Sequence, residues 1–188
     1  MIDIFTNYLS NSSAITIIVL LVLSIYLISI IWVFIYRYMN LNALVTNEKR
    51  SLESLVMNSH MTINPLSKLS RCTKNNSTSK EILHACEISI IREASVGISW
   101  LSIVASTSPF IGLFGTVVGI LEAFAVFAGV EKVSFGTIAP AISEALIVTA
   151  VGIFVAIFAY TFHQILSRKV YELNTYLKAQ SEILISRA

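Results

Sequence analysis

Charged residues are scarce in this sequence: Asp, Glu, Lys and Arg make up only 13% of its 188 residues, whereas hydrophobic residues make up 55%. A soluble domain carries about twice that charged fraction. The net charge is only +2, and no stretch of Lys and Arg is dense enough to follow a phosphate backbone, which argues against a nucleic-acid partner. The composition instead indicates a membrane protein surrounded by a lipid bilayer.

Residues that carry soluble chemistry are also few. The three histidines are scattered, and none has metal-ligand spacing to a carboxylate or a cysteine. The only cysteines, Cys72 and Cys86, lack CxxC spacing. Both fall in a segment that the charge distribution places in the cytoplasm, so we expect reduced, structural thiols. Because no pair of nucleophile and base stands out, we expect no metal, no cofactor and no enzymatic activity.

Three apolar runs are long enough to cross a bilayer core of about 30 Å. We expect the first transmembrane helix over residues 14–36, where Arg37 ends the run. The second lies over residues 95–128 and contains most of the charge-free run 94–121. The third covers residues 134–163 and is interrupted by a charge only at Glu144. The expected fold is therefore an all-α, polytopic membrane protein with three spans.

Basic residues set the expected orientation of these spans. Eight of the 13 Lys and Arg residues lie between Arg37 and Arg92, four follow the third span, and only Lys132 lies between the second and third spans. The positive-inside tendency therefore predicts an N-out, C-in topology. The first thirteen residues carry no basic residue, so the N-terminal run is expected to be a span rather than a cleaved signal peptide.

The two parts expected in the cytoplasm, residues 37–94 and 164–188, are interpreted as helical extensions. Apolar spacing predicts helices over residues 41–57 and 79–91, separated by Asn64-Pro65 and the polar residues 73–79. Thr78 or Ser79 is the expected N-cap, and nothing is expected to break this helix before the second span. One further helix is expected over residues 165–185, with an apolar stripe formed by Leu166, Val170, Leu173, Leu177 and Leu184.

Polar residues inside the spans need partners, because an ionised carboxylate in lipid costs several kcal/mol. Glu144 lies either near mid-bilayer, facing a cavity, a partner or a proton, or at the outer interface if its span begins later. In the second span, Thr116 shares a thin face with Gly112 and Gly119, where another helix can approach. Thr149 lies about 140° from Glu144 around the third helix. A lone threonine is usually satisfied by its own helix, but together these residues predict a polar seam.

Two long motifs stand in the second and third spans: PFIGLFGTVVGI at residues 109–120 and APAISEALIVTAVG at residues 139–152. Their sequence, their order and the short turn between them resemble the TolQ/ExbB/MotA proton-channel family, most closely its TolQ and ExbB branch. The resemblance covers residues from about 95 to 165, and the rest of the chain agrees in layout only. The chain is shorter than typical members, mostly between the first and second spans.

The resemblance implies a homo-oligomeric ring, usually a pentamer, in the cell inner membrane. The ring would surround a TolR- or ExbD-like single-span partner whose aspartate carries the proton, and a TolA- or TonB-like protein would join the assembly. It also implies that Thr116 and Thr149 line the pore, with Glu144 and Pro140 on the proton path. The residues that would pack helices together at the pore or ring interface are Pro109, Gly112, Gly115, Gly119, Ala145 and Gly152.

The biological role within the family stays open. The third-span motif slightly favours a TolQ-like role in Tol-Pal envelope maintenance and cell division over an ExbB-like role in TonB-dependent uptake. A non-conducting scaffold, in which the small residues only pack helices, is a second alternative. Glu122 matches no family role, and it is interpreted as an interfacial residue or as part of an ion entrance.

Overall fold

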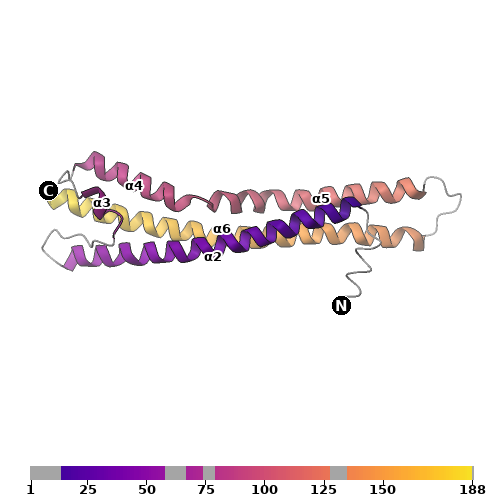
Figure 1. Cartoon of the computed structure of the whole chain (residues 1–188), viewed down its shortest axis with the longest axis horizontal. Helices are drawn as coiled ribbons and strands as arrows, with labels where there is room; N and C mark the ends of the chain where they lie inside the picture. The colour runs from indigo at the N-terminus through magenta and orange to yellow at the C-terminus, as the bar shows by residue number, and fades with distance from the viewer. Residues whose placement is uncertain (1–13, 58–66, 74–78, 128–134, 188) are drawn as a thin grey trace. The chain divides into compact units, whose positions relative to one another are not determined.

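The computed structural model describes residues 14–57, 67–73, 79–127 and 135–187, and the regular structure in these residues is all α-helix. The helices are α2 (Ala14–Met57), α3 (Ser70–Thr73), α4 (Lys80–Ser95), α5 (Ile98–Phe127) and α6 (Phe135–Arg187) (Figure 1). Within α2, α5 and α6, three stretches are long and apolar enough to cross a membrane: Ile15–Met57, Ile98–Ala125 and Ile138–Ser186. The expected all-α fold with three long apolar helices is confirmed.

Two of these helices extend far beyond the apolar runs. Helix α2 continues through the predicted helix 41–57, and α6 joins the third apolar run to the predicted C-terminal helix. Neither junction contains a proline or a glycine, so no backbone hydrogen bond is lost where the sequence turns polar. The predicted loop at Asn64-Pro65 and the turn at residues 129–133 lie outside the described residues.

The expectation of an unbroken helix from residue 79 into the second span is wrong. Helix α4 ends at Ser95, Val96 has an extended ψ of 133°, and Gly97 has φ +83°. Glycine enters this left-handed region without the steric cost that a Cβ brings, and it commonly stops helices there. Ser79 is the N-cap of α4 as predicted, although its side chain makes no capping hydrogen bond.

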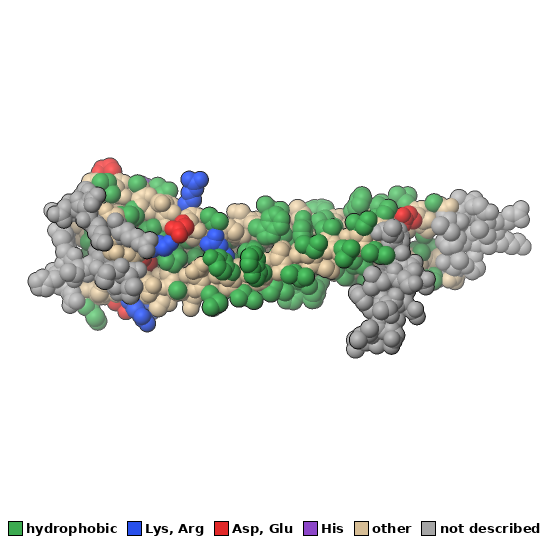
Figure 2. All heavy atoms as spheres, viewed as in Figure 1, with side chains coloured by type: hydrophobic (Ala, Val, Ile, Leu, Met, Phe, Trp, Pro, Cys, Tyr) green, Lys and Arg blue, Asp and Glu red, His purple; other side chains and the backbone are tan. Residues whose placement is uncertain are grey.

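The chain forms two compact units: unit 1 comprises residues 1–32 and 100–161, and unit 2 comprises residues 33–99 and 162–188. In unit 1, Leu23, Leu101, Val104, Val148 and Val155 are buried between α2, α5 and α6. Large apolar side chains also remain exposed, and they cover much of the face of unit 1 seen in Figure 2. Such a surface needs lipid or another protein against it, which fits a membrane-spanning unit.

Unit 2 has an interior of its own, and charged side chains gather over it (Figure 2). Four residues of the stripe predicted on the C-terminal helix are buried there, and Val170 is half-buried. Leucines from α2 and α4 complete this interior; the buried side chains are Leu41, Leu55, Leu83, Leu166, Leu173, Leu177 and Leu184.

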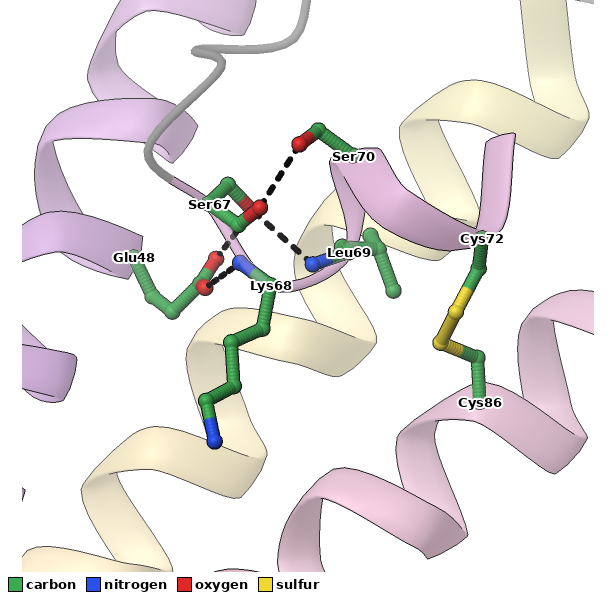
Figure 3. The surroundings of a disulfide bond; sticks show 7 residues. All are labelled: Glu48, Ser67, Lys68, Leu69, Ser70, Cys72 and Cys86. Atoms are coloured by element: carbon green, nitrogen blue, oxygen red, sulfur yellow. Dashed lines mark hydrogen bonds between the residues drawn. A yellow bond between two sulfur atoms is a disulfide. The ribbon is translucent and has the colours of Figure 1, made fainter. Parts of the chain in front are cut away.

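A buried polar network also holds unit 2 together. The carboxylate of Glu48 in α2, only 1% exposed, accepts hydrogen bonds from Ser67 Oγ (2.7 Å), the Lys68 backbone N–H (2.7 Å) and Gln180 Nε2 of α6 (3.0 Å). Ser51 Oγ donates to Gln180 Oε1 at 2.9 Å. Figure 3 shows the two oxygens of Glu48 turned toward residues 67 and 68. One carboxylate therefore connects α2, α6 and the segment before α3.

Helix α3, which follows this segment, is joined to α4 by a disulfide between Cys72 and Cys86 (Figure 3). The expectation of reduced thiols is therefore wrong. It rested on the expected compartment, whereas the fold brings the two Cα atoms to 6.4 Å, within the range that a disulfide spans. An ion pair between Lys68 and Glu93 of α4, at 2.7 Å, adds a second link.

Replacing Glu48 with leucine is expected to lower the free energy of unfolding by about 3 kcal/mol, because Ser67 Oγ and the Lys68 N–H lose their acceptor in a buried site. Glu53 in the same helix is the control, since its side chain is 59% exposed and pairs with Lys49 at 3.9 Å. Glu53→Leu should change stability by less than about 0.5 kcal/mol. SDS titration followed by circular dichroism measures both, and equal losses would contradict the network's role.

Candidate functional site

The two motifs meet where α5 and α6 cross in unit 1. A Cβ on Gly152 would lie 2.9 Å from the Cα of Gly112 and 2.7 Å from the backbone oxygen of Ser108, and a Cβ on Gly112 would lie 3.1 Å from the Cα of Thr149. These neighbours are backbone atoms, which cannot move aside as a side-chain end can. Glycine at both positions lets the two backbones touch, as small residues do in membrane helix pairs.

The close approach brings the two threonines of the motifs into direct hydrogen-bond contact. Thr116 Oγ1 lies 3.1 Å from the carbonyl oxygen of Ala145 and 3.3 Å from that of Gly112, and Thr149 Oγ1 lies 3.1 Å from the same Gly112 oxygen. Each bond to Gly112 or Ala145 has its donor on a hydroxyl and its acceptor on a carbonyl. We call Thr116 and Thr149 the threonine pair.

The threonine pair has more acceptors than protons. Two hydroxyls supply two hydrogens, while two carbonyl oxygens and the hydroxyls' own lone pairs can receive them. The hydroxyls can therefore exchange partners without leaving a donor unpaired. Thr116 is 8% exposed and Thr149 is half-buried, so Thr149 offers the open side of the pair. A charged group approaching it would meet hydroxyls able to donate or to accept.

The other glycines on α5 admit neighbouring side chains rather than backbone. A Cβ on Gly115 would lie 2.7 Å from Val148 Cγ1 of α6 and 3.2 Å from Val19 Cγ1 of α2. A Cβ on Gly119 would lie 3.3 Å from the Cβ of Ala145. Gly112, Gly115 and Gly119 thus line the face of α5 that packs against α2 and α6 within unit 1.

Three predicted residues lie away from the threonine pair. Glu144 is half-buried and precedes Thr149 by five residues, which places it about 140° round the helix from that threonine. Pro140 is exposed inside α6 and removes one N–H from its hydrogen-bond ladder. Pro109 is half-buried inside α5 and has the same effect there. In the described part of the chain, no three His, Cys, Asp or Glu side chains are grouped so as to hold a metal ion.

Ser108 also lies at this crossing of α5 and α6, although its sequence context suggested no role for it. Ser108 is completely buried beside Gly152, and its hydroxyl has no hydrogen-bond partner among the described residues. Its position four residues before Gly112, on the side of the helix that also carries Thr116, could have placed Ser108 at this helix contact.

Residues 48–179 match the sequence profile of the MotA/TolQ/ExbB proton channel family, a stretch that contains the threonine pair and most of both helices that present it. The chain belongs to this family. Members of the MotA/TolQ/ExbB family are proton channels rather than an established group of enzymes. With three long apolar helices, the chain is accordingly a multi-pass membrane protein.

Several proteins of the MotA/TolQ/ExbB family resemble the chain in sequence. ExbB-like biopolymer transport proteins from two Helicobacter pylori strains are 40% identical to it over the full length of both chains. The Tol-Pal system protein TolQ of Pseudomonas aeruginosa is 39% identical over 56% of this chain and 42% of its own. The biopolymer transport protein ExbB of Pseudomonas putida is 36% identical over 51% of this chain and 30% of its own. The resemblance to the TolQ and ExbB branch is confirmed.

Proposed function

We propose that this chain is the proton-conducting subunit of an inner-membrane motor that works with a single-span, TolR- or ExbD-like partner. The observation that carries the proposal is the threonine pair, which the glycine contact of α5 and α6 assembles from two motifs. The family match supports proton conduction. The expected topology, N-out and C-in, would place the predicted helical extensions in the cytoplasm.

The threonine pair suits an aspartate that gains and loses a proton inside the membrane. An aspartate in a membrane span cycles between charged and neutral forms only if its surroundings compensate part of the desolvation cost. Hydroxyls can donate to the carboxylate and accept from the carboxylic acid. Thr116 Oγ1 reaches the carbonyl oxygens of Gly112 and Ala145, and Thr149 Oγ1 reaches that of Gly112. Because each hydroxyl has a carbonyl acceptor nearby, it can return to a bonded state when the aspartate leaves.

A homo-oligomeric ring is part of the same proposal. Exposed apolar side chains on α5 and α6, among them Phe110, Leu113 and Phe154, need lipid or protein around them. A ring of copies, usually a pentamer in the family, would cover part of this surface and leave a central space for the partner helix. Glu144 and Pro140 would then lie on the proton path away from the threonine pair.

The process that the motor energises is proposed from the relatives. Those that match over their whole length are named as ExbB-like biopolymer transport proteins, which favours TonB-dependent uptake across the outer membrane. The TolQ proteins match shorter parts of the chain, at 48% identity over 73 residues in Haemophilus influenzae, so Tol-Pal envelope maintenance is the second candidate. Loss of iron-complex uptake in a deletion strain would support the first role, and detergent sensitivity with chained cells would support the second.

The chain and its co-purifying single-span protein should together make liposomes proton-permeable. The two would be reconstituted with a pH-sensitive dye inside, and a potassium diffusion potential would drive protons inward. We expect dye acidification only when both proteins are present, because the aspartate comes from the partner. Native mass spectrometry of the same sample gives the composition of the complex. A homo-oligomer that binds no single-span protein and carries no proton current would instead establish the scaffold alternative.

A further inference from the structure

Two buried side-chain oxygens lack a hydrogen-bond partner in the described part of the chain, Ser108 Oγ and Glu122 Oε2. Both belong to α5. They are fourteen residues apart, so on an α-helix they lie within about 40° of each other and about 21 Å apart along the axis. Gly112, Gly115 and Gly119 lie within about 40° of Ser108 on the stretch between them, whereas Thr116 lies about 80° from Ser108 and about 120° from Glu122 around the helix. The unpartnered oxygens therefore lie on either side of Thr116 along α5, at the two ends of its glycine-containing stretch.

Ser108 departs from the usual behaviour of a hydroxyl in a helix. Ser106 and Thr107 donate to the carbonyl oxygen of Ile103 at 3.0 and 2.8 Å, whereas Ser108 Oγ makes no such bond and is 0% exposed. The next residue, Pro109, has no N–H, so the carbonyl of Ala105 lacks its helical donor. A hydroxyl without a partner and, within one turn, a carbonyl without its i+4 N–H donor are two of the contacts that a buried water needs.

Glu122 presents the corresponding arrangement at the other end of this stretch. The residue is half-buried, but its Oε2 atom is buried without a partner. A carboxylate oxygen without a hydrogen bond in an apolar span is costly. A water molecule on Oε2 removes that cost, and the exposed part of the residue leaves a route for the water to enter.

We propose that Ser108 and Glu122 each bind a water molecule, and that these waters deliver protons to the threonine pair and remove them at its other side. The inference rests on the proposed function, since it extends the same proton path. Each water passes on one proton as it receives another, so both residues end each transfer unchanged. About 12 Å of helix separates Ser108 from Thr116 and about 9 Å separates Thr116 from Glu122, and the partner's aspartate would carry the proton across these intervals.

The water at Ser108 can be tested without measuring transport. If Ser108 Oγ is dry, Ser108→Ala removes an unsatisfied hydroxyl and should raise the melting temperature of the purified complex. If it holds a water, the same substitution removes one of that water's partners and should lower the melting temperature. Ser106→Ala, at an exposed position of the same helix, is the control for loss of a serine hydroxyl. A cryo-EM map at a resolution that shows waters should contain density beside Ser108 Oγ and Glu122 Oε2; empty sites would overturn the proposal.

Proton flux in the liposome assay separates this inference from the proposed function. We expect Ser108→Ala and Glu122→Leu each to reduce the flux at least fivefold. Glu122→Gln should retain more flux than Glu122→Leu, because an amide still binds water. Ser106→Ala should give the same flux as the unchanged chain. Normal flux in Ser108→Ala and Glu122→Leu, with flux lost in Thr149→Val, would reject the two water sites and keep the threonine pair. Normal flux in Thr149→Val would reject the role of the threonine pair, whereas absence of flux in the unchanged complex would reject the proposed function itself.

Discussion

Gly152→Ala is expected to separate α5 from α6 and to lower the free energy of unfolding by about 3 kcal/mol. The added methyl would lie 2.7 Å from the backbone oxygen of Ser108 and 2.9 Å from the Cα of Gly112. Backbone atoms of a helix can retreat only if the whole helix shifts, so the contact would open along several residues. SDS titration of the detergent-solubilised complex, followed by circular dichroism, measures the loss.

The separation should also disconnect the threonine pair, because Thr149 Oγ1 reaches the carbonyl oxygen of Gly112 at 3.1 Å only while the backbones touch. Proton flux should therefore fall together with stability. Gly119→Ala is the matched control, since its new methyl would meet the side-chain Cβ of Ala145 at 3.3 Å. We expect this variant to lose less than about 1 kcal/mol of the free energy of unfolding. Equal losses of stability in the two variants would show that the Gly112–Gly152 contact tolerates an added methyl group no less well than the contact at Gly119.

Part of this arrangement could be predicted from the sequence. The scarcity of charge and the long apolar runs indicate membrane helices, because lipid accepts few other structures. The recurrence of Gly112, Thr116 and Gly119 on one face indicates close helix packing, and in the structure a Cβ on Gly112 would lie 3.1 Å from the Cα of Thr149. The resemblance to a family implied that Thr116 and Thr149 both line the pore, but their contact with each other was not predicted. Periodicity shows which residues share a face of one helix and not which faces meet.

The remainder depends on contacts between residues far apart in the chain. Glu48 and Gln180 are 132 residues apart and meet because α2 and α6 pack together in unit 2. Cys72 and Cys86 pair because α3 lies beside α4. The break at Gly97 was missed for another reason: a single glycine in an apolar stretch fits a tolerated helix residue as well as a helix end, and only its φ of +83° decides.

Thr149→Val is expected to reduce proton flux at least tenfold while changing stability by only about 1 kcal/mol. Valine has nearly the shape of threonine, so the packing against Gly112 is kept and only the hydroxyl is lost. Thr116 is not left unpaired by the change, because its hydroxyl still reaches the carbonyl oxygens of Ala145 at 3.1 Å and Gly112 at 3.3 Å. A large loss of flux with a small loss of stability would identify Thr149 as a functional rather than a packing residue.

Thr149→Ser supplies the control, because it restores the hydroxyl and omits only the methyl. We expect the serine variant to recover most of the flux that valine loses. Thr116→Val and the double variant complete a cycle: because the two hydroxyls share one hydrogen-bonded unit, the double variant should lose little more flux than either single variant. Losses that simply add would mean that the threonines act separately. Unchanged flux in Thr149→Val and Thr116→Val would mean that the proton path lies elsewhere, since both variants lack the hydroxyl of the threonine that they replace.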